Sequence, residues 1–189
     1  EAFIVTWAGG GFVPMFGAAK EQGVFDEMSL AASLANNAAV PIYAPAIGQN
    51  SGILYHYMLP DNEINDWLVE MDLARYGTPP DLFDADGMNA AIMVIEGLKK
   101  TGGVATADVL IPALEGLSFE GPKGTIQVRP EDHVAIQDMY IVEILNVDDK
   151  DMKFFELVET TRPEPPCLLP EALKDRCGDL PYGSLAGTP

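Results

Sequence analysis

The stretch that decides the fold is residues 117–142, LSFEGPKGTIQVRPEDHVAIQDMYIV. Its first residues predict the end of a helix. The sequence GPKG at 121–124 predicts a tight turn, because proline presets φ and glycine tolerates positive φ. Residues 125–128 then alternate polar and apolar side chains, which is typical of a half-buried strand. The first half of the stretch therefore predicts a turn that leads into a strand.

The second half of the stretch predicts a charged loop and a second strand. Asp132 and His133 lie in the loop, where we expect a hydrogen bond between them to brace the backbone rather than to form a reactive site. Residues 139–145 are a nearly continuous β-branched and apolar run, typical of a strand that is buried on both faces. A further strand is predicted at 152–157.

Strands and helices also alternate before this stretch. An apolar run predicts a strand at 3–7, which leads through a glycine loop into a helix that ends near Gly23. Two further strands are predicted at 28–32 and 53–58, and between them residues 36–51 are predicted as a loop, with a short helix inside it as the alternative. This alternation predicts an α/β fold with a mainly parallel sheet.

Two longer helices are predicted between residues 61 and 102. The first is capped by Asp61 or Asn62, and the second has Asp84 near its start. Each carries apolar residues along one face at helical spacing. These stripes are Ile64, Trp67, Leu68 and Met71 in the first helix, and Met88, Ala91, Ile92, Ile95 and Leu98 in the second.

The composition excludes several classes of function. The chain has 189 residues, of which 48% are hydrophobic and 21% charged, as in an ordinary folded protein. Its net charge of −18 argues against nucleic acid as a partner, because a phosphate backbone needs Lys and Arg to neutralise it. No stretch approaches the roughly 20 apolar residues that a membrane span requires.

The sequence offers little that could carry out a reaction. His56 lies in an apolar run between tyrosines, which favours a core or hinge residue over a general base. Neither histidine belongs to a nucleophile motif. Two cysteines and two distant histidines do not have the spacing of a metal site. We therefore predict no catalytic residue, no metal ligand and no cofactor.

The order of elements in residues 117–142 resembles the C-terminal segment of type 1 periplasmic solute-binding proteins, the branched-chain amino-acid-binding family of ABC transporters. The resemblance implies a periplasmic-binding-protein-like type I fold, in which two lobes of mainly parallel sheet, flanked by helices, are joined by a hinge. Residues 1–53 are then expected in the C-terminal lobe, 54–140 in the N-terminal lobe after a hinge crossing, and 141–189 back on the C-terminal lobe.

The resemblance covers most of this chain but only the latter half of a family member. Residues 1–5 lack a basic signal-peptide region and look like the inside of a strand. We therefore expect that the N-terminal part of the same protein precedes this chain and is required. The resemblance also implies that the protein is exported to the periplasm.

The resemblance also implies ligand contacts in the loop after the first strand. Trp7, Ala8, Gly9 and Gly10 match the family's first contact loop, and a glycine loop before a helix can present backbone N–H groups to an anion. Core packing is the alternative role for Trp7. The spacing of these glycines is not that of a nucleotide-binding motif, which weakens a nucleotide-using enzyme as an interpretation.

Two more contact loops are implied further along the chain. Amino-acid-binding members place an acidic side chain after the next strand, where this sequence has only Ser33 and Asn36. This difference favours a less charged or aromatic carboxylate over an α-amino acid. The third loop contains Phe83, which could cover an apolar ligand, and Asp84, which could cap a helix, contact the ligand, or do both.

Cys167 and Cys177 lie ten residues apart near the C-terminus. A disulfide between them suits an exported protein and would contribute about 2–3 kcal/mol by restricting the unfolded chain. Two unpaired thiols in a cytosolic protein are the alternative.

These features together predict the solute-binding component of an ABC importer. It would close a hinge around a small amino acid or organic carboxylate and dock on a membrane permease. A ligand-sensing domain of the same fold in a receptor or regulator is the alternative, and a nucleotide-using enzyme is less well supported.

Overall fold

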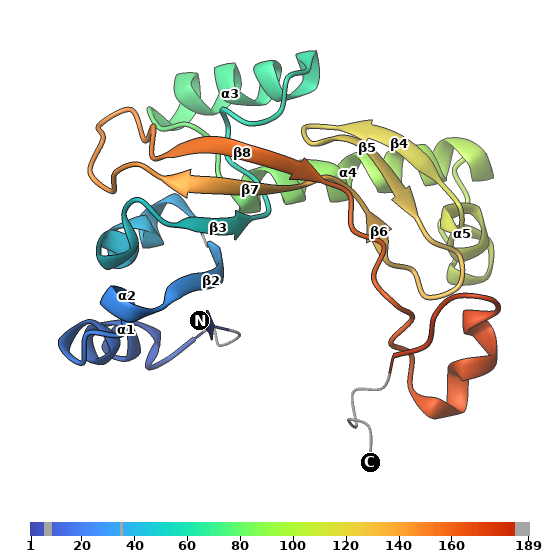
Figure 1. Ribbon diagram of the computed structural model, residues 1–189. Helices are drawn as coiled ribbons and strands as arrows, with labels where there is room; N and C mark the ends of the chain where they lie inside the picture. The colour runs from blue at the N-terminus through green and yellow to red at the C-terminus, as the bar shows by residue number, and fades with distance from the viewer. Residues whose placement is uncertain (6–8, 35, 184–189) are drawn as a thin grey trace. The chain divides into compact units, whose positions relative to one another are not determined.

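The computed structural model of the protein describes residues 1–5, 9–34 and 36–183 (Figure 1). It divides into two compact units. Unit 1 comprises Glu1–Asp86 and Met139–Thr161, and unit 2 comprises Gly87–Asp138 and Arg162–Pro189. The lobe assignment of residues 1–53, 54–140 and 141–189 stays a prediction, because compact units do not by themselves identify lobes.

Unit 1 is built on a five-stranded sheet in the order β1-β2-β3-β7-β8. β1 and β2 are parallel, as are β2 and β3, whereas β7 runs antiparallel to both β3 and β8. The α/β class is confirmed, but the sheet is mixed, because β7 and β8 form a hairpin (Figure 1). The strands are β1 (Ala2–Val5), β2 (Ser29–Leu34), β3 (Asn50–Ile53), β7 (Met139–Ile144) and β8 (Phe155–Thr161).

The helices of unit 1 are α1 (Phe12–Glu21), α2 (Val24–Glu27), the 3-10 helix η1 (Asn37–Ala46) and α3 (Glu63–Tyr76). Phe16 of α1 and Tyr43 of η1 are almost completely buried, with their ring centroids 5.2 Å apart. They join the inner face of β7, whose residues Tyr140, Val142 and Ile144 are also buried. This cluster is the core of unit 1.

The strand predicted at 53–58 is wrong, since β3 ends at Ile53. The residues that follow bind other partners instead of continuing the ladder. Tyr55 Oη donates to Asn65 Oδ1 of α3 (2.7 Å), and the next side chain, His56, contacts the Met152 carbonyl through Nε2 (2.9 Å). These side-chain contacts draw the segment away from the sheet.

The capping signals of α3 predicted its ends correctly. Asn62 Oδ1 accepts hydrogen bonds from the second and third residues of the helix, and Gly77 ends it at φ 74°. Its predicted apolar stripe is only partly buried. Leu68 is buried, but Trp67 is 54% exposed and Met71 is 43% exposed.

Unit 2 contains a three-stranded antiparallel sheet in the order β4-β5-β6. The turn at 121–124 and the strand after it are confirmed. The helix end predicted before the turn is wrong, because a two-residue hairpin turn needs a partner strand, which residues 118–121 provide. The elements are α4 (Leu82–Thr101), which begins in unit 1, α5 (Ala107–Leu114), β4 (Ser118–Gly121), β5 (Gly124–Val128), β6 (Ala135–Ile136) and the 3-10 helix η2 (Glu171–Cys177).

One face of α4 packs in the core of unit 2. Ile92 and Met93 contact a cluster of buried side chains from the sheet and the residue before it. That cluster consists of Leu117, Phe119, Ile126 and Val128. The stripe predicted from the sequence is therefore only partly correct, because Ile92 packs in this core whereas Ala91 and Ile95 are exposed. Among the described residues, no helix has the length and apolar character needed to cross a membrane.

Candidate functional site

The first predicted contact loop lies at the start of α1. Gly9 and Gly11 have positive φ values of 117° and 91°, which side chains rarely adopt, and Gly9 accepts a hydrogen bond from the Phe12 N–H (3.2 Å). Gly9 and Gly10 are exposed at this helix N-terminus, where backbone N–H groups favour an anion. Trp7 and Ala8 lie outside the described residues.

The second loop follows the carboxyl end of β2. β1 and β2 are parallel, with Val5 opposite Ala32, so the carboxyl ends of both strands lie at the same end of the sheet. Ser33 pairs through its backbone with Gly52 of β3, and Asn36 follows just beyond the strand. Asn36 Oδ1 accepts a hydrogen bond from the Ala39 N–H (3.1 Å) and so caps η1.

A hydrogen bond connects the second loop with the third. Asn37 Nδ2 donates to the Pro80 carbonyl oxygen (3.5 Å), just before α4. The start of α4 is a reciprocal cap, in which Asp81 accepts from the Phe83 N–H and Asp84 accepts from the Asp81 N–H, both at 2.9 Å. The capping role of Asp84 is confirmed, with Asp81 as the N-cap residue. Phe83 is 65% exposed.

Carboxylates surround a buried tyrosine near this cap. Burial raises the pKa of Tyr55 above its usual range, and the negative charges of Asp72 and Asp84 raise it further. The pKa of Asp72 is raised by its own desolvation and then by Asp84. The charge beside the third loop is therefore negative, which favours a cationic group on a ligand there.

The two histidines have structural roles. His56 is completely buried, and burial lowers its pKa to about 4, so it is neutral at physiological pH. This confirms His56 as a core residue. His133 Nε2 lies 2.8 Å from Glu115 Oε1, and Arg176 Nη2 lies 3.3 Å from the same oxygen.

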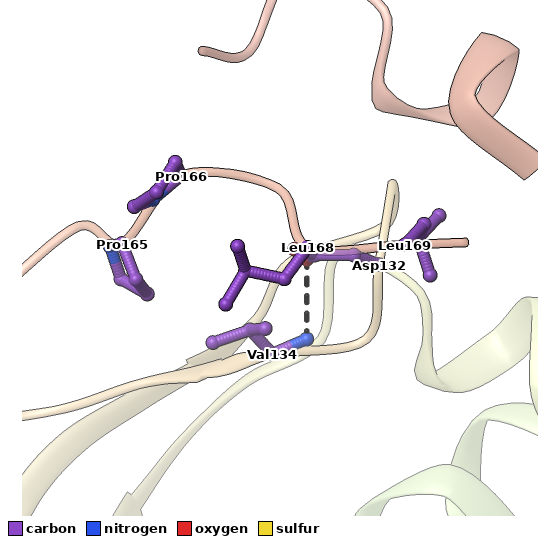
Figure 2. A pocket seen from close by; sticks show the side chains of 6 residues that line it. All are labelled: Asp132, Val134, Pro165, Pro166, Leu168 and Leu169. Carbon is purple, nitrogen blue, oxygen red and sulfur yellow. Dashed lines mark hydrogen bonds between the residues drawn. The ribbon is translucent and has the colours of Figure 1, made fainter. Parts of the chain in front are cut away.

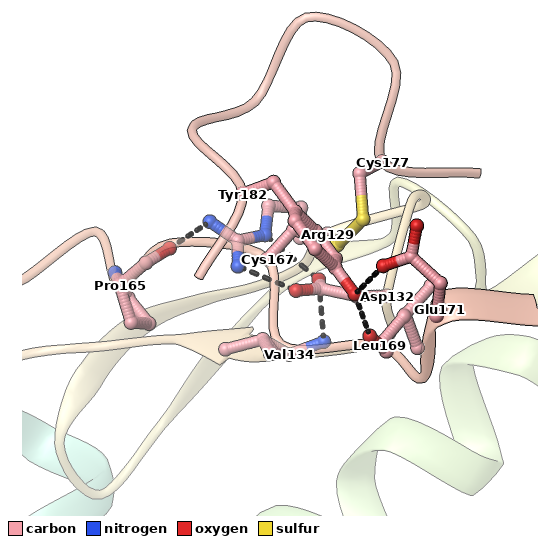
Figure 3. Close-up of a disulfide and its surroundings, with 9 residues drawn as sticks. All are labelled: Arg129, Asp132, Val134, Pro165, Cys167, Leu169, Glu171, Cys177 and Tyr182. Carbon is pink, nitrogen blue, oxygen red and sulfur yellow. Dashed lines mark hydrogen bonds and ion pairs between the residues drawn. A yellow bond between two sulfur atoms is a disulfide. The ribbon is translucent and has the colours of Figure 1, made fainter. Parts of the chain in front are cut away.

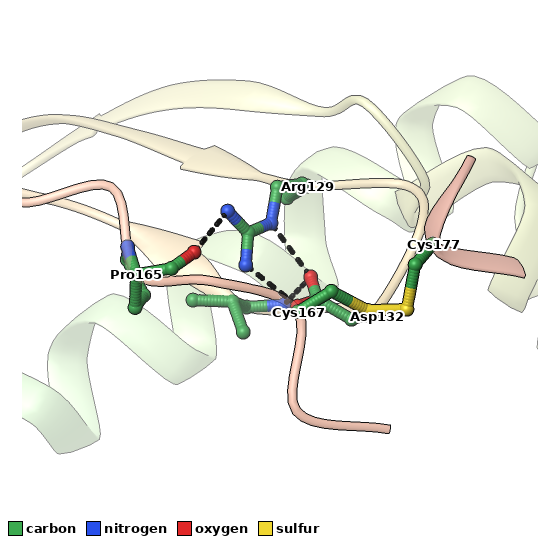
Figure 4. Close-up of polar contacts among 6 residues, drawn as sticks. Arg129, Asp132, Pro165, Cys167 and Cys177 are labelled. Carbon is green, nitrogen blue, oxygen red and sulfur yellow. Dashed lines mark hydrogen bonds and ion pairs between the residues drawn. A yellow bond between two sulfur atoms is a disulfide. The ribbon is translucent and has the colours of Figure 1, made fainter. Parts of the chain in front are cut away.

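The partner predicted for Asp132 is wrong. Arg129, not His133, binds its carboxylate through two contacts, Nε to Oδ1 at 2.8 Å and Nη2 to Oδ2 at 2.6 Å (Figure 4). This bond to Arg129 holds the pKa of Asp132 below its usual range. The bracing role is right, because Asp132 also accepts from the Val134 N–H (3.3 Å). Arg129 and Asp132 are three residues apart in the same turn between β5 and β6, so both partners of the pair were present in the predicted loop.

The disulfide between Cys167 and Cys177 is confirmed (Figure 3). It lies near the Arg129–Asp132 pair. Arg129 Nη1 donates to the carbonyl oxygen of Pro165 (2.8 Å), which is two residues before Cys167. The Cys167 N–H donates to the Pro181 carbonyl oxygen (2.8 Å), and its own carbonyl accepts from the Gly183 N–H (2.9 Å). The bond from Arg129 ties the C-terminal segment to the turn after β5, whereas the two bonds of Cys167 join residues within that segment.

Two hollows among the described residues lie away from the predicted contact loops. A cavity of 180 Å³ in unit 2 is smaller than the roughly 300–1,000 Å³ of small-molecule pockets. Its lining residues are Asp132, Val134, Pro165, Pro166, Leu168 and Leu169 (Figure 2). An open groove of 620 Å³ in unit 1 lies between residues 57–60 and α3. Neither hollow contains a predicted contact residue. No group of three or more His, Cys, Asp and Glu side chains among the described residues could hold a metal ion.

The chain is similar in sequence to known proteins. A family model described as periplasmic binding protein matches residues 1–151. Leu/Ile/Val-binding protein homolog 6 of Brucella abortus (strain 2308) is 30% identical over an alignment 126 positions long that covers 59% of this chain and 32% of that protein.

Two solved structures have a similar fold. An ABC-type branched-chain amino acid transporter from Rhodopseudomonas palustris CGA009 matches with a TM-score of 0.70 and 32% identity, over 84% of this chain and 42% of that one. An ABC transporter solute binding protein from Rhodopseudomonas palustris BisB5, in complex with 3,4-dihydroxybenzoic acid, matches with a TM-score of 0.68 and 23% identity, over 86% and 45% of the chains. The chain thus spans about a third of the curated relative and less than half of each solved structure.

Proposed function

Because this chain belongs to the periplasmic binding protein family, we propose that it forms part of the solute-binding component of an ABC importer. In this proposal the protein is exported to the periplasm, binds a small molecule without transforming it, and delivers it to a membrane permease. The observation that supports the proposal is the arrangement of the segments in which we predict ligand contacts. The strands before the first two, β1 and β2, are parallel, and Asn37, which follows the second, donates a hydrogen bond to the Pro80 carbonyl oxygen just before the third.

Each loop would recognise a different part of the ligand. The backbone N–H groups around Gly10, at the start of α1, suit a carboxylate. The ring of Phe83 offers an apolar surface for the body of the ligand. Closure would follow if the ligand made more contacts in the closed than in the open form, since only differential affinity shifts such an equilibrium.

The ligand class follows from the charges beside these loops. Asp84 could hold an ammonium group, which favours a small amino acid. Ser33 and Asn36 provide no carboxylate after β2, which favours an aromatic or other organic carboxylate. The solved structures with a similar fold include both kinds of protein, a branched-chain amino acid transporter and a solute binding protein in complex with 3,4-dihydroxybenzoic acid.

We also propose that ligand binding requires the N-terminal half of the same protein. The contact loops described here would supply one side of a cleft only. Small-ligand sites usually bury most of the ligand surface, so 189 residues alone should bind weakly or not at all.

Thermal unfolding of the complete polypeptide with leucine, benzoate, 4-hydroxybenzoate and ATP tests the proposal. A ligand at about 100 times its Kd stabilises by about 2.7 kcal/mol, which raises Tm by several degrees. We expect this shift with leucine or with a benzoate. Stabilisation by ATP alone would contradict the proposal.

Two variants then test the roles of individual residues. Phe83→Ala should weaken binding about tenfold or more, whereas Tyr76→Ala, which removes a similarly exposed ring of unit 1, should leave the affinity unchanged. Asp84→Asn keeps an oxygen that can cap the helix but removes the charge. It should weaken the binding of leucine and spare that of benzoate.

A further inference from the structure

The open groove of 620 Å³ between residues 57–60 and α3 lies apart from the predicted contact loops. Its volume is within the roughly 300–1,000 Å³ of small-molecule sites. Every residue that lines it belongs to unit 1, so the groove is formed within one compact unit. We call it the α3 groove.

A buried asparagine holds the two walls of the α3 groove together. Asn65 of α3 is 2% exposed, and its Nδ2 donates to the carbonyl oxygens of Tyr57 (3.0 Å) and Pro60 (3.3 Å). Tyr57 Oη in turn donates to the Asp151 carbonyl oxygen (2.8 Å), which fixes the orientation of its ring. Because the walls are already joined, a ligand would not have to order them on binding.

The helix wall of the α3 groove combines carboxylates with apolar side chains. Four of its residues follow i, i+3, i+4, i+7 spacing and so form one stripe of the helix. They are Asp66, Val69, Glu70 and Leu73. Asp66 and Glu70 are exposed, and neither forms an ion pair among the residues that the structure describes. Like charges one turn apart destabilise a helix, so a cation between them would be stabilising.

Apolar and aromatic surface lies beside these carboxylates. Met58 on the opposite wall is 49% exposed, and Leu73 on the helix is 46% exposed. The ring of Tyr57 also lines the α3 groove and can attract a cation to its face. Thioether and aryl groups suit an apolar ligand body. The two walls together therefore match a ligand that has both a positive charge and an apolar body.

We propose that the α3 groove is a second binding site, which takes an organic cation with an apolar body, such as an arylalkylammonium ion. The ammonium group lies between Asp66 and Glu70. The apolar body lies against Met58 and Leu73. This site goes beyond the proposed function, whose ligand is bound by the contact loops. Because the carboxylates are exposed, binding is weak, with a Kd of about 1 mM for 2-phenylethylammonium.

NMR titration of the complete polypeptide with 2-phenylethylammonium chloride tests the proposal and locates the ligand. The backbone amides of Met58 and Glu70 should shift and reach saturation. Two further probes separate charge from apolar surface. At the same amides, 3-phenylpropionate, which has the same aryl body with a negative charge, should bind at least about tenfold more weakly. Methylammonium, which has the charge without the aryl body, should also bind at least about tenfold more weakly.

Variants at exposed positions of α3 then assign the contacts. Replacing Asp66 by Asn and Glu70 by Gln in one variant should weaken binding about tenfold. Glu63→Gln removes an exposed carboxylate of the same helix that does not line the groove, and it should leave the affinity unchanged. Leu73→Ala should weaken binding about threefold. Met71→Ala, at a similarly exposed position outside the groove, should have no effect.

Several results would overturn the proposal. One is the absence of saturable shifts at Met58 and Glu70, and another is an unchanged affinity in the variant that lacks both carboxylates. Displacement of the cation by leucine would place it at the contact loops instead. Binding of trilysine at these amides, with no binding of 2-phenylethylammonium, would assign the α3 groove to a basic protein segment and also overturn the proposal.

The second site and the proposed function can fail separately. The thermal shift with leucine or benzoate should be the same in the wild type and in the variant that lacks both carboxylates, because neither residue belongs to a contact loop. Cation binding in a protein that binds none of the solutes tested above would contradict the proposed function alone. A thermal shift with leucine or benzoate, without cation binding, would contradict the second site alone.

Discussion

Arg129 and Asp132 form a buried ion pair in unit 2, and Arg129 also donates a hydrogen bond to the Pro165 carbonyl oxygen of the C-terminal segment. The side chain of Arg129 is 10% exposed and that of Asp132 is 3% exposed. Asp132→Asn would leave a buried guanidinium without its charged partner, and we expect it to lower the free energy of unfolding by about 3 kcal/mol at neutral pH. Urea denaturation measures the loss.

The pH dependence of this effect has a definite sign. The pKa of Asp132 is lowered in the folded state, so its stabilisation is present above the unfolded pKa of about 3.9 and is lost as pH falls through the folded pKa. The difference between wild type and variant should therefore shrink in strong acid. Glu96→Gln is the control, because its pair with Lys99 is exposed and should contribute less than about 1 kcal/mol. Equal effects of the two substitutions would contradict the prediction.

His56 should make stability depend on pH in weak acid. Burial lowers its folded pKa to about 4, whereas the unfolded value is about 6.5. The unfolded state therefore binds the proton first, and on the order of 3 kcal/mol of stability should be lost as pH falls between these values. His56→Gln keeps an N–H donor for the Met152 carbonyl and does not titrate. The free energy of unfolding of this variant should therefore change less with pH in that range than that of the wild type. His133→Gln, at an exposed position, should retain the wild-type dependence.

At the scale of elements, the packing of the β4–β5 hairpin against α4 depends on a glycine. A Cβ atom at Gly121 would collide with Asn89 Oδ1, and Asn89 is buried. Neither polar atom of the Asn89 amide has a hydrogen-bond partner in the described part of the chain. Gly121→Ala should therefore lower the free energy of unfolding by about 2 kcal/mol.

A double-mutant cycle checks the cause of this loss. Asn89→Ala removes the colliding atom and should recover most of the stability in the Gly121→Ala background. Gly87→Ala, in the same helix and with nothing near its Cβ position, should raise the stability of the 189-residue chain by up to about 1 kcal/mol. Additive effects of the substitutions at 89 and 121 would exclude the collision as the cause.

Helix ends were predicted better than helix faces. The cap at Asn62 and the glycine at 77 depend on residues within one turn, so the local sequence contains the information. The buried face of α4 depends on which layers surround it. Because both faces are apolar, the sequence pattern could not choose between them.

At the scale of the whole molecule, the disulfide should stabilise one unit and not the other. Replacing both cysteines by serine should cost about 2–3 kcal/mol, because the link restricts the unfolded chain. Hydrogen exchange of the Val128 N–H, which donates to Leu117 in unit 2, should accelerate. The Ile144 N–H, which donates to Gln49 in unit 1, should keep its protection. Equal acceleration at both amides would contradict the prediction that the disulfide stabilises unit 2 alone.

The candidate site was predicted only in part, for a physical reason. The order of strand, glycine loop and helix is local, so the sequence could place Gly9 and Gly10 at a helix start. The connection between Asn37 and Pro80 joins residues 43 positions apart, which no local pattern contains. Roles for Ser33, Phe83 and Asp84 in ligand binding stay predictions.

The sequence by itself determined what depends on near neighbours: the turn at 121–124, the strand at 139–144, the caps of α3, and an order of elements that identified the family. Tertiary structure decided what depends on distant partners. It made β7 and β8 an antiparallel pair, paired Asp132 with Arg129 instead of His133, and determined which face of α4 is buried. Side-chain chemistry permitted more than one answer in each of these cases, and only the packing of segments far apart in the chain selected one.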